Sequence, residues 1–125
     1  MQRLLKRGFT LIELLVVLAI VATLLTLVVP RYFQHVERSR EAVLKENLAT
    51  VRDAIDKYHA DTNTWPPTLE ALAERRYLRA VPVDPLTERA DTWQTVPPPD
   101  GGSGVYDLRS GAEGAGLDGV PYGDW

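Results

Sequence analysis

The sequence predicts an α+β fold in which one long amino-terminal helix is followed by a small head. Residues 9–29 hold 17 apolar residues and one charge, and apolar side chains then continue at helical spacing to about Ala60. Eight of the nine glycines lie between Gly101 and Gly123, so the carboxy-terminal end has a different composition from the helix. With 125 residues and no cysteine, the chain builds at most one small domain without disulfides.

Charge is distributed unevenly along the chain. The total is 14 Lys plus Arg against 17 Asp plus Glu, a formal net charge of −3. Three of the basic residues, Arg3, Lys6 and Arg7, precede the apolar run, so the remainder is more acidic still. An acidic body disfavours a nucleic-acid partner. The lack of cysteine excludes thiol catalysis and cysteine-ligated zinc.

The apolar run predicts a membrane-spanning helix. Its 21 residues would extend about 31 Å as an α-helix, which matches the hydrocarbon layer of a bilayer. Basic residues on its amino side predict that residues 1–8 lie in the cytoplasm and that the carboxy-terminal part lies outside. Because the run ends in Val28-Val29-Pro30-Arg31 rather than in small residues, cleavage after it is not indicated.

Glu13 is the one charged residue in this run. A carboxylate in a spanning segment costs about 2.5–3.5 kcal/mol when it lies centrally and less near the interface. Two interpretations follow from the residues alone. The side chain extends to the lipid headgroups, or it meets a cationic partner in an assembled state.

The string Lys6-Arg7-Gly8-Phe9-Thr10-Leu11-Ile12-Glu13-Leu14-Leu15-Val16-Val17 resembles the type III signal of prepilins and pseudopilins. The resemblance implies that a prepilin peptidase cleaves between Gly8 and Phe9 on the cytoplasmic side and that the new Phe9 amine is methylated. It places Glu13 at an acidic position whose carboxylate pairs with the Phe9 amine of a neighbouring subunit. Pro30 matches a family position where missing helix hydrogen bonds permit a bend or local melting.

On this interpretation residues 1–8 are a cytoplasmic leader, 9–29 the transmembrane half of the long helix, 30–60 its amphipathic half and 61–125 a periplasmic head. The amphipathic half is predicted from apolar residues spaced three, four or seven apart: Val36, Val43, Leu44, Leu48, Val51, Ile55 and Tyr58. A helix of about 78 Å is too long for the head to cover, so half of it must contact lipid or other subunits. Its charged residues, with Glu41 and Lys45 at the favourable i, i+4 spacing, are interpreted as a solvated face.

The head is predicted to contain a short helix and one antiparallel hairpin. Turn formers end the long helix at 61–67, and Thr68 caps a helix over Leu69 to Arg76. Strands are expected at Thr92 to Val96 and at Val105 to Arg109. This order of elements resembles the major pseudopilin of type II secretion systems over nearly the whole chain and implies a pilin-like fold.

The glycine-rich end allows two interpretations. It resembles the family's calcium loop, although it is shorter and has Glu113 where an aspartate is usual. Oxygen ligands for Ca²⁺ are available from Ser110, Glu113 and Asp118, with Asp107 or Asp124 as further candidates. The alternative is a metal-free coil that Tyr122 and Trp125 hold in place.

The function expected from the resemblance is that of a structural subunit that polymerises into a filament for type II secretion. Its implied partners are copies of itself, other pseudopilins, the prepilin peptidase, a cytoplasmic ATPase, an inner-membrane platform protein and an outer-membrane secretin. The chain is not expected to be an enzyme, because His35 and His59 are too far apart on one helix to share a centre and no nucleotide or hydrolase motif is present. The alternatives are a type IV pilin and a membrane-tethered periplasmic binding module.

Overall fold

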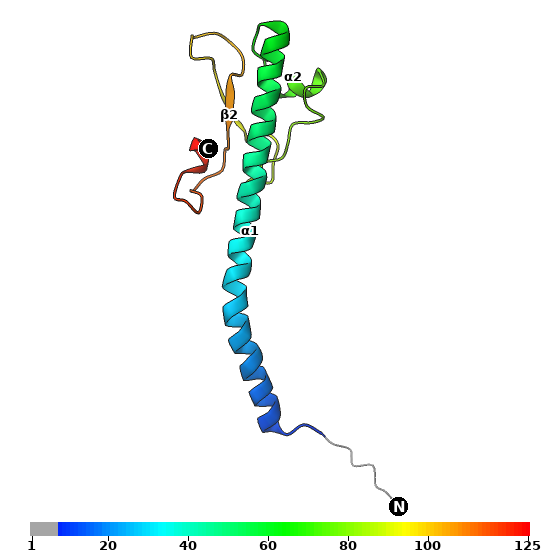
Figure 1. Cartoon of the computed structure of the whole chain (residues 1–125), viewed down its shortest axis with the longest axis vertical. Coiled ribbons are helices and arrows are strands. Elements are labelled where there is room, and N and C mark those ends of the chain that lie inside the picture. Colours follow the sequence, from blue (N-terminus) through cyan, green and yellow to red (C-terminus); the bar gives the residue numbers. More distant parts are fainter. Residues whose placement is uncertain (1–7) are drawn as a thin grey trace, which may run out of the picture. The chain divides into compact units, whose positions relative to one another are not determined.

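A computed structural model of the chain describes residues 8–125. The elements in order are α1 (Leu11–Thr62), α2 (Leu69–Glu74), β1 (Gln94–Val96), β2 (Asp107–Arg109) and a 3₁₀ turn, η1 (Tyr122–Asp124) (Figure 1). The α+β prediction is confirmed. The chain divides into two compact units between Val36 and Glu37, and helix α1 contributes to both.

In the first unit, α1 exposes its apolar side chains. Phe9 is 86% exposed, and the large apolar residues from Leu11 to Val29 are all exposed. The helix begins at Leu11, two residues later than the sequence predicts. Phe9 and Thr10 precede it and belong to no helix. It stays helical through Pro30, so the bend or melting that proline permits does not interrupt it.

In the second unit, one face of α1 forms half of the core. Leu44, Leu48, Val51, Ile55 and Tyr58 are buried at the predicted helical spacing, and Ala54 joins them. The prediction is wrong for Val43, which is 48% exposed. Its neighbour Leu44 is fully buried, and consecutive residues of a helix point about 100° apart, so both cannot face the core.

Helix α2 begins as predicted and ends early. The Thr68 hydroxyl accepts a hydrogen bond from the Ala71 amide at 3.2 Å, which satisfies one free donor of the first turn. The helix stops at Glu74 instead of Arg76, because Arg76 has a positive φ of 61° and leaves the right-handed helical region. Leu69 and Leu72 of α2 are buried.

The two strands form the predicted antiparallel pair but are shorter than expected. The register pairs Gln94 with Arg109, Thr95 with Leu108 and Val96 with Asp107. Residues that were expected at the start of each strand make tertiary contacts instead. Trp93 is buried, with its indole N–H donating to Pro82 O at 2.8 Å, and Val105 N donates to Pro66 O at 2.7 Å.

The core of the second unit lies around α1. Figure 1 shows α2 on one side of this part of α1, and β2 with the carboxy-terminal segment on the other. Leu72 from α2, Leu108 from β2 and Tyr122 from η1 complete the apolar cluster. Two polar residues are also buried, Asp84 and Ser110.

Candidate functional site

The predicted cleavage site lies in an exposed stretch without regular structure before α1. Gly8, Phe9 and Thr10 are exposed and belong to no helix or strand. A Cβ built on Gly8 would meet no heavy atom within 4 Å, so the chain's own packing does not require glycine there. The Gly8–Phe9 peptide bond is therefore accessible to another protein, and any demand for a small residue at Gly8 must come from that protein.

A capping box joins Thr10 to Glu13 at the start of α1. The Glu13 amide donates to the Thr10 hydroxyl at 3.1 Å, and the Thr10 amide donates to Glu13 Oε2 at 3.3 Å. These two bonds satisfy amide donors that have no partner within the helix, and the carboxylate lies at the positive end of the helix dipole. The Thr-x-x-Glu spacing that signals such a box is present in the sequence at Thr10 and Glu13, but no cap was predicted there.

This geometry gives Glu13 a role within one chain that neither interpretation of the sequence included. The side chain is exposed, four residues from Phe9, and its carboxylate is directed at the backbone of the residue next to Phe9. The acid is therefore held close to the position where cleavage after Gly8 would create an amine.

Helix α1 is also the one described helix that is long and apolar enough, by length and composition, to cross a membrane. None of the residues in its apolar window is buried within the chain. This surface and the capped end are continuous in sequence. Together they make residues 8–29 the candidate functional site.

The predicted calcium ligands make contacts of their own. The Ser110 hydroxyl is buried and donates to Asp84 Oδ2 at 2.5 Å. Asp118 Oδ1 accepts the Val120 amide at 3.0 Å, within its own turn, and Glu113 is exposed. Within residues 8–125, no three His, Cys, Asp or Glu side chains are grouped so that they could hold a metal ion. As they stand, these residues do not fit a calcium site, because the serine is already paired and the carboxylates do not converge.

Two charged residues of α1 bind the carboxy-terminal segment instead. Arg52 donates to Asp107 Oδ1 at 2.7 Å, to Leu108 O at 3.1 Å and to Trp125 O at 2.7 Å. Glu41 Oε1 accepts the Leu117 amide at 2.8 Å and the Tyr122 hydroxyl at 3.2 Å.

Glu41 departs from the predicted solvated face, because it is half-buried and makes these bonds. Lys45 is exposed as predicted, and its Nζ lies 4.8 Å from the centre of the Trp125 ring. No role was predicted for Arg52, although its place directly after the core residue Val51 was a usable signal. The pKa of Tyr122 is raised above its ordinary value, first because its side chain is buried and second because its hydroxyl donates to Glu41.

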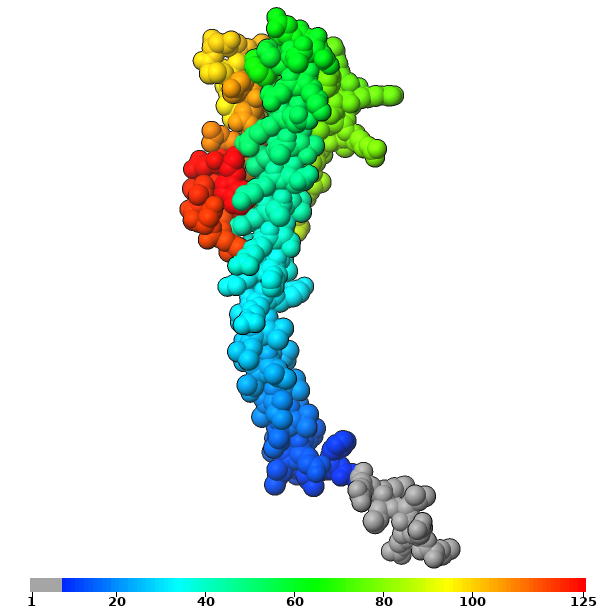
Figure 2. All heavy atoms as spheres, viewed as in Figure 1, coloured from blue at the N-terminus to red at the C-terminus, as the bar shows by residue number. Residues whose placement is uncertain are grey.

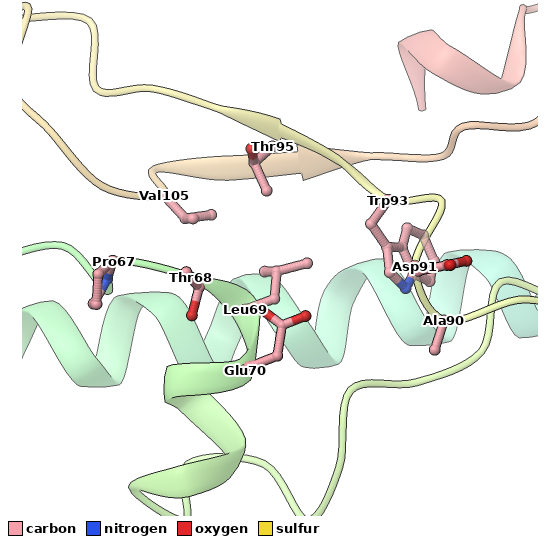
Figure 3. Close-up of a pocket in the computed structure, with 9 residues that line it drawn as sticks. All are labelled: Pro67, Thr68, Leu69, Glu70, Ala90, Asp91, Trp93, Thr95 and Val105. Atoms are coloured by element: carbon pink, nitrogen blue, oxygen red, sulfur yellow. The ribbon is translucent and has the colours of Figure 1, made fainter.

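A shallow groove of about 190 Å³ separates α2 from the strands (Figure 3). Glu70 lies on its α2 side, and Asp91 and Trp93 lie on the other. Asp91 is paired with Arg89 at 2.6 Å, and this hydrogen bond lowers the pKa of Asp91. The Trp93 N–H already donates to Pro82 O, so the polar side chains left in the groove are its two carboxylates and the hydroxyls of Thr68 and Thr95.

Comparisons with known proteins identify both the amino-terminal segment and the whole chain. Residues 3–29 match the family model described as the prokaryotic N-terminal methylation motif. The type II secretion system core protein G of Pseudomonas aeruginosa is 32% identical over an alignment 145 positions long, which covers 100% of this chain and 99% of that protein.

The proteins of the same name from Klebsiella pneumoniae and Vibrio cholerae are 32% and 29% identical, and the alignments cover 100% and 96% of this chain and 96% and 92% of those proteins. The comparison with solved structures found no significant match. The full-length likeness and the methylation motif agree with the long helix, small head and exposed amino-terminal site described above, and the chain belongs to the type II secretion system core protein G family of pseudopilins.

Proposed function

We propose that this chain is a structural subunit that polymerises, with copies of itself and other pseudopilins, into a periplasmic filament that drives type II protein secretion. The observation that carries the proposal is the exposed apolar surface of α1 from Leu11 to Val29, which includes one exposed acid, Glu13, in its first turn. A surface of this size needs lipid or other helices around it. Membership of the core protein G family supports the filament as its final environment.

The amino-terminal stretch supports processing before assembly. In this proposal a prepilin peptidase cleaves the Gly8–Phe9 bond on the cytoplasmic side of the inner membrane, and the Phe9 amine is then methylated. The exposed, non-helical backbone at residues 8–10 is suited to a protease that must bind an extended substrate. The match of residues 3–29 to the methylation motif supports the second step.

The apolar half of α1 anchors the subunit in the inner membrane before assembly. Arg3, Lys6 and Arg7 favour a cytoplasmic amino terminus, which directs the head to the periplasm. In the filament the helices leave lipid and pack on one another. The Glu13 carboxylate then lies in apolar surroundings, where an unpaired charge is costly, and the Phe9 amine of the next subunit is the cation best placed to pair with it.

The role proposed here is structural, so the energy for extension comes from partners. A cytoplasmic ATPase and an inner-membrane platform protein add subunits at the base, and an outer-membrane secretin receives the secreted protein. Pro30 lies at the end of the apolar half, where its missing N–H lowers the cost of adjusting α1 on entry into the filament.

Complementation of a strain lacking the native gene tests the function. Wild-type protein should restore both secretion and sheared filaments on overexpression. Glu13→Val should insert into the membrane but restore neither, and Glu13→Asp should restore more than Glu13→Val because it keeps the charge. Full secretion by Glu13→Val would contradict the proposal and favour a tethered binding module. Restored surface pili without secretion would favour a type IV pilin.

A further inference from the structure

The carboxy-terminal segment, residues 110–125, contains almost no regular structure, so something other than backbone pairing must hold it. Its only described helix is the single turn η1. Figure 2 shows this segment, in red, lying directly against the part of α1 drawn green to cyan. The contacts across this boundary are therefore the ones that fix its position.

Arg52 makes the central contact. One guanidinium binds a carboxylate oxygen of Asp107 and two main-chain oxygens, Leu108 O and Trp125 O, all within 3.1 Å. Trp125 makes two further contacts. Lys45 Nζ lies over its ring, and its indole N–H donates to Val120 O at 3.2 Å. Side-chain carboxylates and main-chain oxygens are the kinds of ligand that a calcium ion takes from a loop, and here a side-chain cation binds oxygens of both kinds.

Glu41 holds the other part of the segment. Its carboxylate accepts the Leu117 amide and the Tyr122 hydroxyl, and Tyr122 is buried in the core at 7% exposure. Two of the three groups predicted to bind calcium make other contacts. Ser110 is paired with the buried Asp84, and Asp118 closes its own turn. In addition, the positive charge of Arg52 at Asp107 opposes a divalent cation at that carboxylate.

We propose that Arg52, with Glu41, takes the place of a metal ion in holding residues 110–125 against α1, and that the head keeps its stability without calcium. Of the two interpretations of the glycine-rich end, a calcium loop and a metal-free coil, the proposal favours the metal-free coil. The cation is built into the chain, so it is present at every calcium concentration. The pseudopilin would then remain folded in surroundings where calcium is scarce.

The test uses the full chain in detergent and follows thermal unfolding by tryptophan fluorescence. All three tryptophans, Trp65, Trp93 and Trp125, lie in the second unit, so the signal reports on the head alone. A ligand that binds only the folded state raises the melting temperature. We expect the wild-type protein to melt at the same temperature in chelator and in millimolar calcium. A higher melting temperature in calcium would overturn the proposal.

The role of Arg52 is tested by substitution under both conditions. Arg52→Ala should lower the melting temperature by roughly 5–15 °C with and without calcium, and Arg52→Lys should recover part of this loss because it keeps the charge but not the fork. Lys57→Ala is the matched control, since it removes an exposed ion pair with Asp53 on the same helix and should change little. Wild-type melting of Arg52→Ala would overturn the proposal.

Hydrogen exchange gives a local readout that a general loss of stability would not produce. In Arg52→Lys, amides of residues 110–125 should exchange faster while those of the α1 core residues Leu48 to Ile55 keep their protection. If Arg52→Ala fails to fold, this lysine variant and the calcium comparison on the wild type still decide the question. Equal exchange of the segment in wild type and Arg52→Lys would count against the proposal.

Discussion

Thr10 and Glu13 satisfy each other's backbone amides at the start of α1, at 3.1 and 3.3 Å. The acid that the family resemblance assigns to contacts between subunits is thus also part of a helix cap within its own chain. The two roles require different chemistry, because a cap needs only a hydrogen-bond acceptor whereas pairing with an amine needs a negative charge.

Substitutions at these two residues should separate the roles. Glu13→Gln keeps a side chain that can cap but removes the charge, so filament assembly and secretion should fall while membrane insertion persists. Thr10→Ala removes the capping hydroxyl and keeps the charge. It should cost about 1 kcal/mol of local helix stability, which the membrane largely offsets, and secretion should stay near the wild-type level. Immunoblots of sheared filaments and secretion assays measure the effect of each substitution. If Thr10→Ala lowered assembly and secretion more than Glu13→Gln, the helix cap would be the dominant role.

Processing should depend on Gly8 through the peptidase and not through folding. Mass spectrometry of the membrane-extracted protein should find a mature chain of residues 9–125 with one added methyl group. Gly8→Leu should accumulate as precursor in the membrane, with the head folded as in the wild type, because a Cβ at Gly8 would meet no heavy atom within 4 Å. Normal maturation of Gly8→Leu would contradict the assignment of the cleavage site.

Stability of the head should fall at alkaline pH. The pKa of Tyr122 is raised in the folded state, first by burial and then by its bond to Glu41. In the unfolded chain a tyrosine ionises near pH 10, so the unfolded state loses this proton first. The contribution is therefore complete below about pH 10 and is lost as the pH rises through the raised pKa of Tyr122.

Tyr122→Phe should reduce this alkaline loss, whereas Tyr106→Phe, at an exposed residue, should leave it in place. Unfolding followed by tryptophan fluorescence between pH 8 and pH 11 measures the difference, with phenolate absorbance as the titration signal. Identical pH profiles for wild type and Tyr122→Phe would show that Tyr122 does not control the effect.

The buried pair of Ser110 and Asp84 should be important for stability. Asp84 is 0% exposed, and its carboxylate accepts the Ser110 hydroxyl at 2.5 Å and the Leu86 amide at 2.9 Å. Ser110→Ala leaves a buried acceptor without its donor and should cost about 1–3 kcal/mol of unfolding free energy. Ser103→Ala, in an exposed loop, is the control and should stay within about 0.5 kcal/mol. Urea unfolding of the full chain measures both, and equal stabilities would mean that Asp84 finds another donor.

Sequence alone determined the long helix and its apolar segment. These features are local, because an unbroken apolar run and a three-to-four residue spacing specify a helix and its buried face without reference to the rest of the chain. The helix cap at Thr68 and the pairing of two strands followed from equally local signals. The Thr10 cap was readable in the same way from its Thr-x-x-Glu spacing.

Only the tertiary structure decided which distant residues meet. Arg52 is 55 residues from Asp107, and Glu41 is 76 residues from Leu117, so no spacing rule links either pair. Tertiary contacts likewise limit the length of the strands. The Trp93 indole donates to Pro82 O and the Val105 amide donates to Pro66 O, so neither residue extends the pairing of the two strands. The sequence offered oxygen ligands and a glycine-rich loop, but which oxygens meet a cation depends on what folds against them, and here the arginine of α1 reaches Asp107 Oδ1, Leu108 O and Trp125 O.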